Sequence, residues 1–457
     1  AGTVEFLLAK TPNIDPIINA SGTADFHTNS TARFSSLTFL GTDGIYTLLR
    51  AAGGINLNDR DLDDLVAFDR PFLFHSEFDL TSDGDADTIS LSLVRKTAAE
   101  LNLTANSVAI YDAALIAANE DDIFGRGLLA ITDQAGVEQS LSSLLPNIGV
   151  GARALSIAVT DSIGGPIGRR QRSLIATPEQ GLRFWGQQFY QDLNGGSTAT
   201  APSFFASGSG ISVGMEWGQT PTVRYGVSYT YFAGQVSETG VQTTKENIAL
   251  NLVSAYASWR SNGFFVTPQA NVGYASYDNR RRVVAGPITR RAISDWNTFL
   301  TSGGVTSGYV MDLGGFQVIP HISVDGLYMH DTAYTERFGG PGVSLAIGTR
   351  TSRSVRVFAG VVAQTEFALD DGIMKPQILA GWSQDLVNDR ATIDASFEAV
   401  PGSDFSVVGP VSDASRLLGG ASFSYLFNNW SAAFSYDASH ASGALAQSAS
   451  ISMTSRF

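Results

Sequence analysis

The chain has 457 residues and is 44% hydrophobic, so it is too apolar for a disordered protein and long enough for more than one folded unit. Its formal net charge is −14, and it has no Lys/Arg block of the kind that binds polyanions, which excludes nucleic acid as an expected partner. The absence of cysteine excludes thiol catalysis, disulfides and cysteine-based zinc sites.

The general composition favours strands and turns. Only 16% of residues are charged and 47 are glycine, which is typical of a mostly β protein. No window approaches 18 consecutive apolar residues, so no transmembrane helix is expected, although a membrane barrel hides its hydrophobicity in alternation. The sequence starts at Ala1 without the basic and apolar segments of a signal peptide, so we expect a signal peptide to be removed or to lie upstream. We therefore expect the chain to be a fragment.

The first region, 1–105, has short strand patterns separated by polar turns. Strands are expected at 32–40, 44–51, 72–80 and 88–94, where mainly apolar side chains occupy every second position. Both the end of a β-solenoid and a small sandwich fit this pattern. The acidic run at 79–87 is interpreted as a hairpin loop, because it lacks the glutamate that a calcium loop has at its twelfth position.

The second region, 106–179, has apolar residues at helical spacing from Val108 onward. After Pro146 a further helical stretch runs to Ile163, where the Gly-Gly-Pro sequence at 164–166 is expected to end it. A basic segment at 169–172 follows. This region is therefore expected to be a helical connection.

The third region, 180–457, has twelve strand candidates of roughly 10 to 14 residues. A strand of roughly 12 residues, at about 3.3 Å per residue and a tilt of about 40°, spans about 30 Å, which is the thickness of the hydrocarbon core. Tight turns alternate with longer loops, such as 280–291 and 331–353. The candidates begin near Leu182, Phe204, Val223, Asn247, Phe264, Trp296, Phe316, Ser354, Ile373, Arg416, Trp430 and Gln447.

The strands alternate between an apolar and a polar face. Val213 and Met215 share one face of their strand, while Ser212 and Glu216 share the other. A soluble sandwich alternates too, with its apolar face inward, but repetition over twelve long strands favours a barrel with apolar residues toward lipid. The tryptophans near strand ends are expected at a membrane interface. The polar side chains expected to face the lumen are Glu216, Arg224, Asp325, Arg356 and Glu366.

The most specific resemblance begins after Met374. The segments PQILAGWSQDL, DASFEAVPGSDFSVVGP, RLLGGASFSYLF, WSAAFSYDAS and SASISMTSRF resemble, in this order, the last four strands of type Va autotransporter translocators. The order of parts over essentially the whole chain is similar to that family. The resemblance implies a mostly β fold, with a passenger end at 1–105, a helical linker at 106–179 and a twelve-stranded antiparallel transmembrane β-barrel with a lumenal helix at 180–457.

The resemblance also implies a function and partners. The barrel would insert into the bacterial outer membrane and export or anchor its own passenger, with residues 1 to about 105 on the extracellular side. Outer-membrane lipid, lipopolysaccharide, periplasmic chaperones and the barrel assembly machinery would be its partners. The terminal pattern Ile451, Met453 and Phe457 resembles the signal that this machinery recognises. Some families cut their own passenger at a linker asparagine with lumenal acidic groups, for which Asn147 and Asp161 are isolated candidates.

The sequence offers little support for a metal site or for a catalytic nucleophile. The five histidines are scattered without metal-ligand spacing, and no metal site or cofactor is expected. Ser212 lies in a GxSxG match, but inside a strand rather than at a strand-to-helix elbow, so a lumen-facing hydroxyl is expected. The arginines at 280–282 and 290–291 are expected in an external loop, either solvated or paired with lipopolysaccharide phosphates.

Three functional classes stay open at this point. The first is a secretion device that is not an enzyme. The second is a diffusion porin, against which residues 1–175 argue. The third is the membrane anchor of a surface enzyme or adhesin whose active part lies upstream of Ala1.

Overall fold

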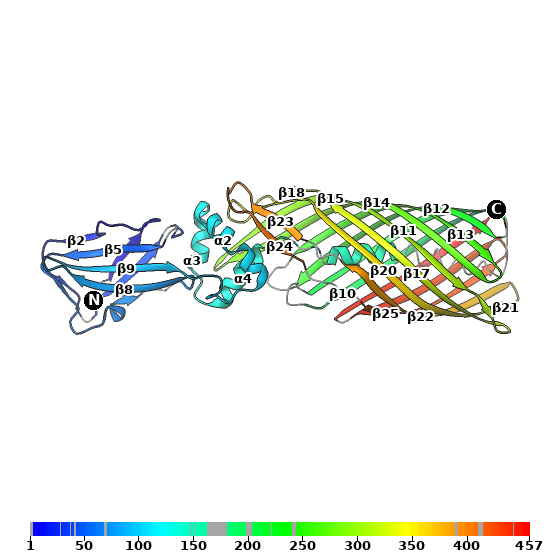
Figure 1. Cartoon of the computed structure of the whole chain (residues 1–457), viewed down its shortest axis with the longest axis horizontal. Helices are drawn as coiled ribbons and strands as arrows, with labels where there is room; N and C mark the ends of the chain where they lie inside the picture. The colour runs from blue at the N-terminus through cyan, green and yellow to red at the C-terminus, as the bar shows by residue number, and fades with distance from the viewer. Residues whose placement is uncertain are drawn as a thin grey trace.

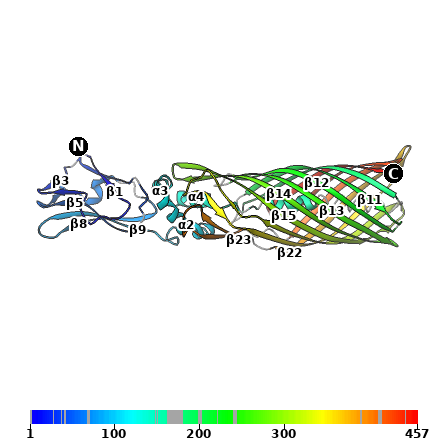
Figure 2. The same cartoon turned by 90° about the horizontal axis from the view of Figure 1, so that it is seen from above.

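The protein is described by a computed structural model in which an N-terminal β unit, a group of helices and a barrel follow one another along one axis (Figures 1 and 2). The structure describes residues 3–27, 29–36, 38–40, 43–67, 71–147, 149, 151–161, 181–197, 203–220, 222–239, 244–388, 392–409, 415–441 and 443–457.

Residues 181–456 supply a closed antiparallel barrel of twelve strands. Each strand pairs with the next around the wall, β10 pairs with β27, and β15 pairs with β17, so no long edge is left open. The predicted twelve-stranded barrel is confirmed. The strands are β10 (Gly181–Gly195), β11 (Ser203–Gly218), β12 (Val223–Thr239), β13 (Lys245–Ser261), β14 (Phe264–Ala285), β15 (Ile288–Tyr309), β17 (Phe316–Asp331), β20 (Arg350–Thr365), β22 (Gly372–Asn388), β25 (Ser415–Phe427), β26 (Trp430–Ala441) and β27 (Ala444–Arg456).

The wall has the expected two faces. The side chain of Val213 is 53% exposed on the outside, whereas that of Ser212 is 1% exposed on the inside. Two tryptophans depart from the expectation that they would lie at a membrane interface, because Trp185 and Trp296 are buried on the inner face. Their aromatic rings pack within the lumen, which a strand-end position in the sequence could not indicate.

The strands vary more in length than the sequence indicated. β14 and β15 each have 22 residues and continue well beyond their neighbours, joined by a turn at Gly286, whose φ is +53°. The predicted loop at 280–291 is therefore wrong, and so is the predicted strand start at Trp296. The residues of this hairpin keep the two-residue period of a strand, and the charges of two of its arginines, Arg281 and Arg290, are matched by partners outside the barrel strands.

The strands of the N-terminal unit stack in parallel, as in a β-solenoid. β1 (Thr3–Leu8), β4 (Thr31–Ser36) and β7 (Val66–Ala67) stack in parallel, as do β2 (Ile18–Ala20) with β5 (Gly44–Ala51) and β3 (Ala24–Asp25) with β6 (Ile55–Asn56). The antiparallel pair β8 (Phe74–Ser82) and β9 (Asp87–Arg95) adds to β5, and α1 (Leu62–Leu65) precedes β7. Parallel stacking at about 30-residue intervals is typical of solenoid rungs and decides against the sandwich.

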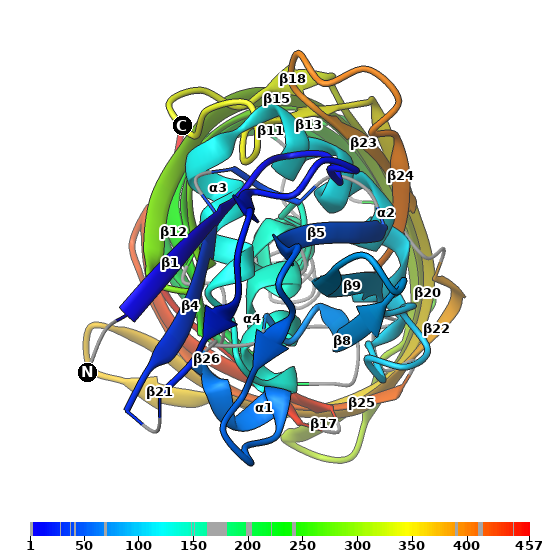
Figure 3. The same cartoon turned by 90° about the vertical axis from the view of Figure 1, so that its left-hand side faces the viewer.

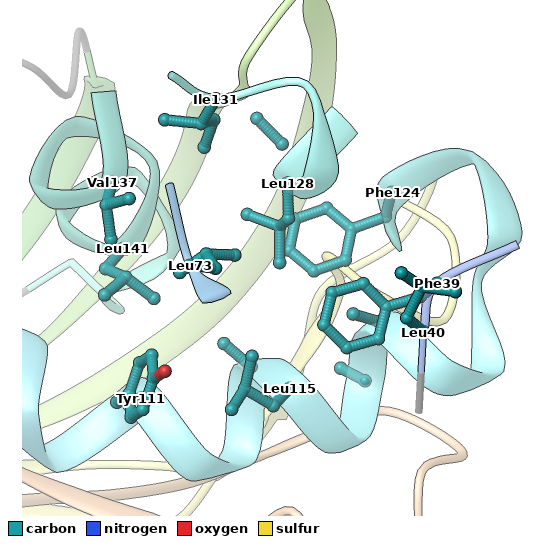
Figure 4. Close-up of a cluster of buried hydrophobic side chains, with 14 of the residues drawn as sticks. Phe39, Leu40, Leu73, Tyr111, Leu115, Phe124, Leu128, Ile131, Val137 and Leu141 are labelled. Atoms are coloured by element: carbon teal, nitrogen blue, oxygen red, sulfur yellow. The ribbon is translucent and has the colours of Figure 1, made fainter. Parts of the chain in front are cut away.

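Three helices connect this unit to the barrel: α2 (Ala105–Glu120), α3 (Asp122–Leu129) and α4 (Gln134–Leu144). The Asp121 and Asp133 side chains cap α3 and α4 by accepting hydrogen bonds from main-chain N–H groups. Phe124, Leu128 and Leu141 contribute to a cluster with Phe39 and other residues of the β unit (Figure 4). The helices are thus packed rather than loosely tethered.

A second sheet lies above the barrel mouth beside these helices. It comprises β18 (Tyr334–Thr335), β19 (Leu345–Ile347), β23 (Thr392–Phe397) and β24 (Phe405–Val408), all from segments between barrel strands. We call this sheet, together with the hairpin tip at 283–292, the collar, and that end of the barrel the collar end. The opposite end has tight turns, as at 262–263 and 428–429, and is called the turn end.

A further helix at 151–161 lies within the ring of barrel strands (Figure 3). The predicted helix break at 164–166 and the basic segment at 169–172 lie outside the described residues. In the part of the chain that the structure describes, no helix is both long and apolar enough to cross a membrane.

Candidate functional site: the barrel lumen and its collar-end mouth

The lumenal helix is held to the wall by apolar packing. Ala152, Leu155 and Val159 are buried against inner-wall side chains of β10 to β15, among them Phe189 and Phe232. The two phenylalanine rings stack on each other with centroids 6.0 Å apart. Because burial of apolar surface stabilises by about 25 cal/mol per Å², this contact fixes the helix on one side of the lumen.

The other side of the helix makes polar contacts. The Arg153 Nη2 atom donates a hydrogen bond to the Arg353 carbonyl oxygen at 2.9 Å, and Asp161 forms an ion pair with Arg356. Asp325 lies directly opposite Arg356 in the β17–β20 register. Two of the predicted lumen-facing residues, Asp325 and Arg356, therefore come together beside the end of the described helix.

The other three predicted lumen residues lie nearer the turn end. The Glu216 carboxylate is buried, accepts a hydrogen bond from the Tyr256 hydroxyl at 3.0 Å, and lies 3.6 Å from the Arg224 Nη1 atom. Glu366 lies just past the end of β20, where its carboxylate oxygen is 2.7 Å from the Lys375 Nζ atom. The side chain of Glu366 is partly exposed, and the chain continues directly into β21 (Phe367–Leu369), which pairs with β22.

Asn147 lies buried at the collar-end mouth with all of its side-chain amide engaged. Its Nδ2 donates to Glu246 Oε2 at 2.7 Å, and its Oδ1 accepts from the Gly149 N–H at 2.7 Å. Its main-chain oxygen accepts from Arg350 Nη1 at 3.3 Å, and Arg350 is paired with Asp331 at 2.5 Å. A carboxylate and a guanidinium thus contact the same asparagine from two sides.

Sequence reasoning named Asn147 but not its partners. Glu246 is the second residue of β13 and Arg350 is the first of β20, about one hundred residues apart. Charged residues at strand ends are usually exposed to solvent, so the sequence around Glu246 and Arg350 does not indicate that they contact Asn147. Closure of the barrel brings them together. Asp161, the second cleavage candidate, lies with Arg356 and not with this group.

Arg281 is the most deeply buried charge at the collar. Its side chain is fully buried, and its Nε donates to Glu336 Oε1 at 2.9 Å. Its Nη1 donates to the Ser143 carbonyl oxygen of α4 at 2.8 Å, and its Nη2 donates to that of Val343 at 2.8 Å. The expectation of a solvated or lipopolysaccharide-bound loop is wrong for Arg281, because its charge is matched inside the protein.

Arg290 has a similar internal partner. Its Nη2 donates to Asp121 Oδ1 at 2.9 Å, and Nη1 also contacts this carboxylate. Burial alone would raise the pKa of Asp121, but the bonds from Arg290 and from the Phe124 N–H outweigh it and hold that pKa below its usual value. The remaining arginines differ: Arg282 and Arg291 face each other across the hairpin and are exposed.

The predicted assembly signal lies on the outer wall. Ile451 and Met453 of β27 are exposed, and Phe457 is 76% exposed at the turn end. The Phe457 ring meets the Phe184 ring edge to face, with centroids 5.6 Å apart. The pattern is accessible on one face, while its recognition by an assembly machine stays a prediction.

The other candidate motifs have structural roles. The Ser212 hydroxyl lies 2.8 Å from the Thr230 hydroxyl on the inner wall. The Asp83 carboxylate accepts hydrogen bonds from the N–H groups of Asp85 and Ala86, which build the β8–β9 turn and lower its pKa. Among the described residues, no cluster of three histidine or carboxylate side chains could hold a metal ion.

A family model and several solved structures are similar to this chain. The family description "Autotransporter beta-domain" fits residues 184–437, whereas no curated protein sequence matches the chain. Among solved structures, the translocator domain of autotransporter NalP from Neisseria meningitidis is similar at 15% identity and a TM-score of 0.50, covering 66% of this chain and 98% of that one. The β domain of the Bordetella autotransporter BrkA has 16% identity and a TM-score of 0.45, covering 61% and 100%.

The NalP likeness shows a shared fold, and the family match extends over more than half of the chain. The closed twelve-stranded wall, its apolar exterior and the helix in its lumen agree with that match. The chain belongs to the autotransporter β-domain family, and its barrel is the translocator of a bacterial outer-membrane autotransporter.

Proposed function

We propose that the barrel exports its own N-terminal part and keeps residues 1 to about 105 on the outer surface of the cell, without acting on a substrate as an enzyme. The observation that supports this most is the continuous path from the solenoid end through α2–α4 into the lumen, where the helix at 151–161 lies. The collar end then faces outward and the turn end faces the periplasm.

Surface display is tested with an epitope inserted at Gly84 in the β8–β9 turn and a second one between Asn428 and Asn429 at the turn end. In intact cells, antibody should bind the first epitope and not the second, while permeabilised cells should bind both. Antibody access to the second epitope alone would mean the opposite orientation.

The terminal aromatic is proposed to direct assembly by the barrel assembly machinery, with periplasmic chaperones keeping the chain unfolded beforehand. Phe457 is exposed, and its contact with Phe184 of β10 lies at the β10–β27 seam that closes the barrel. Phe457→Ala should lower the amount of heat-modifiable barrel in membranes several-fold, whereas Phe427→Ala, near a different turn, should lower it much less. Equal effects would assign the loss to ordinary packing.

Lipopolysaccharide is proposed to contact the exposed arginines of the hairpin. Arg282 and Arg291 lie directly opposite each other, and like charges in that position repel unless an anion lies between them. The double variant R282S/R291S should bind less lipopolysaccharide during purification than the wild type. R33S, on the solenoid, is the control. Unchanged binding would leave these arginines merely solvated.

A second candidate function is a single cut of the chain after Asn147, and the contacts of this residue favour it. The Asn147 Nδ2 atom would attack its own main-chain carbonyl carbon, forming a five-membered succinimide while the following C–N bond breaks. Glu246 would take the proton from Nδ2 and pass it to the leaving amine. Arg350 would stabilise the charge that develops on the carbonyl oxygen.

The cut is tested by mass spectrometry of the barrel purified from outer membranes. The proposal predicts a fragment whose sequence begins at the residue after Asn147. N147A should abolish the cut and E246Q should slow it at least 10-fold, while N194A, on β10, should leave it unchanged. An intact wild-type chain would refute self-cleavage without affecting the proposal of surface display.

A further inference from the structure

Gln188 is a polar residue on the lipid-facing side of the barrel. Its side chain is exposed on the outer face of β10, between Ile451 of β27 and Ile211 of β11, which lie opposite it in register. Both isoleucines are exposed on the same outer wall. The Gln188 amide is hydrogen-bonded to no residue that the structure describes. An amide group therefore stands alone on an apolar surface.

The depth of Gln188 makes this position unusual. Leu182, near the start of β10, lies opposite Trp217, which is exposed at the turn end, and aromatic rings at the ends of barrel strands lie at the membrane interface. Gln188 is six residues further along the strand, which corresponds to about 15 Å at about 3.3 Å per residue and a tilt of about 40°. The hydrocarbon core is about 30 Å thick, so Gln188 lies near its middle.

A lone amide at this depth needs a partner. Hydrocarbon chains offer neither a hydrogen-bond donor nor an acceptor, and no water is present there to replace them. Asn251 has such a partner on the same wall, because its Oδ1 accepts a hydrogen bond from the Tyr229 hydroxyl at 2.6 Å. No described residue does this for Gln188, so its partner has to come from another molecule.

A hollow adjoins Gln188 on its turn-end side. A Cβ atom added to Gly186, the next outward position of β10, would meet its nearest atom, the Ser212 carbonyl oxygen, only at 4.0 Å, so the space above this glycine is open. The hollow has a volume of about 790 Å³. A surface that is apolar and carries no charge resembles the buried core of a protein interface. The exposed apolar side chains that line the hollow include Phe184, Val213, Met215, Val227, Met453 and Phe457.

A second copy of the chain supplies a group of the right chemistry at the right depth. A glutamine amide carries both an acceptor oxygen and donor N–H groups, so two such amides can pair through two N–H···O bonds. Homodimers most often have a two-fold axis, and an axis along the membrane normal brings the same residue of each copy to the same depth. A lipid chain would fill the hollow but would leave the amide unpaired.

We infer that two copies associate in the membrane through the outer wall of β10. The Gln188 amides of the two copies pair with each other, and the hollow at Gly186 is covered by the partner copy. This association depends on the position of the barrel in the membrane. It does not depend on export of the N-terminal part or on a cut at Asn147.

Disulfide cross-linking in outer membranes tests this inference. The sequence has no cysteine, so each variant carries a single thiol. Q188C should form a disulfide-linked dimer on oxidation with copper phenanthroline, seen on a non-reducing gel. I322C is the matched control and should yield several-fold less dimer, because Ile322 is exposed on the outer wall of β17, six residues from the start of that strand. Equal yields from the two variants would overturn the inference.

Native mass spectrometry in mild detergent then tests the role of the amide. The wild type should appear at twice the mass of the 48.4 kDa chain. Q188L should weaken the dimer roughly 10-fold, because the hydrogen-bonded pair is lost. N251L is the control and should leave the dimer unchanged, because the Asn251 amide already has a partner within its own chain. Each variant is first shown to be heat-modifiable, so that a loss of dimer is not a loss of folding.

The hollow is tested in the same way. G186L should weaken the dimer by filling the hollow. G419L should not, because Gly419 is exposed on the outer wall of β25, away from β10, with its nearest atom also 4.0 Å from an added Cβ. A wild-type monomer would overturn the dimer. If that monomer carries a phospholipid that G186L loses, the hollow belongs to a lipid chain instead.

Discussion

At the scale of single residues, the buried charges are paired between segments that lie far apart in the chain. The Arg281 side chain is fully buried, and its Nε donates a hydrogen bond to Glu336 Oε1, which lies 55 residues away on a segment of the collar. On the inner wall, Glu216 lies beside Arg224, and Arg356 forms an ion pair with Asp161 of the lumenal helix. Each of these contacts depends on the folding of the whole barrel.

Arg281 should be critical for the collar. Arg281→Met leaves the buried Glu336 carboxylate without its partner and should destabilise the collar by roughly 3–5 kcal/mol. The double variant R281M/E336M should recover much of this loss, because two apolar side chains avoid the isolated charge. Calorimetric unfolding of the purified protein in detergent measures both. An additive loss in the double variant would contradict the coupling.

Glu100 provides a pH-dependent contact in the β unit. Its carboxylate accepts hydrogen bonds from the Thr97 N–H and hydroxyl at 2.7 and 2.8 Å and lies 3.1 Å from His75 Nε2, which together lower its pKa to about 2. Because the pKa of Glu100 is lowered in the folded protein, its ionised form stabilises the turn at pH values above the usual glutamate pKa. This stabilisation is lost as the pH falls toward 2.

The titration of Glu100 is measured by NMR, and amide exchange at Thr97 reports the turn. The protection of the Thr97 amide, measured against its intrinsic exchange rate at each pH, should fall as the pH is lowered below about 4, the ordinary glutamate range. In E100Q this acid-dependent loss of protection should be absent, whereas E77Q should behave like the wild type. A Glu100 pKa near its ordinary value would contradict the account.

At the scale of elements, alternation located most strands because one side of each faces lipid and the other faces the lumen. The starts of β12, β14, β17 and β26 were predicted to the residue. The length of the β14–β15 hairpin was not predicted, because its outer part extends beyond the apolar, lipid-facing band of the barrel. In that outer part, the buried residues of the hairpin face α3 and α4 instead of the lumen. The solenoid could not be distinguished from a sandwich because parallel and antiparallel strands alternate alike.

Close packing of aromatic rings over glycines gives an element-scale prediction. A Cβ atom added to Gly226 of β12 would lie 2.2 Å from the Tyr256 ring on the neighbouring strand. Tyr256 also bonds to Trp185 and Glu216, so its ring cannot move freely. Gly226→Ala should therefore destabilise the barrel by about 1–3 kcal/mol.

The control for this prediction is Gly186→Ala. A Cβ at Gly186 meets its nearest atom at 4.0 Å, so this variant removes a glycine from the wall without crowding a ring. The temperature at which the folded band disappears on a gel should fall for G226A and stay near the wild-type value for G186A. Equal shifts for G226A and G186A would contradict the account, because they would mean that the effect comes from the backbone conformation of glycine and not from the room that it leaves for an aromatic ring.

At the scale of the whole molecule, the three parts share two large hydrophobic cores among the described residues, and a third, small cluster of Phe265, Ile319 and Val362 lies in the barrel. One core lies inside the barrel around the helix at 151–161, and the other joins the solenoid end, α2–α4 and the collar. The order of these parts could be predicted from the sequence, because each has its own periodicity. Their docking could not, since it depends on contacts such as Arg290 with Asp121 between distant segments.

The most direct test of the central claim is heat-modifiability of the 457-residue chain refolded in detergent. The account predicts a β-rich circular dichroism spectrum and a folded band whose gel mobility changes on boiling, as expected for a closed membrane barrel. A stable, water-soluble monomer that folds without detergent and migrates identically before and after boiling would contradict it.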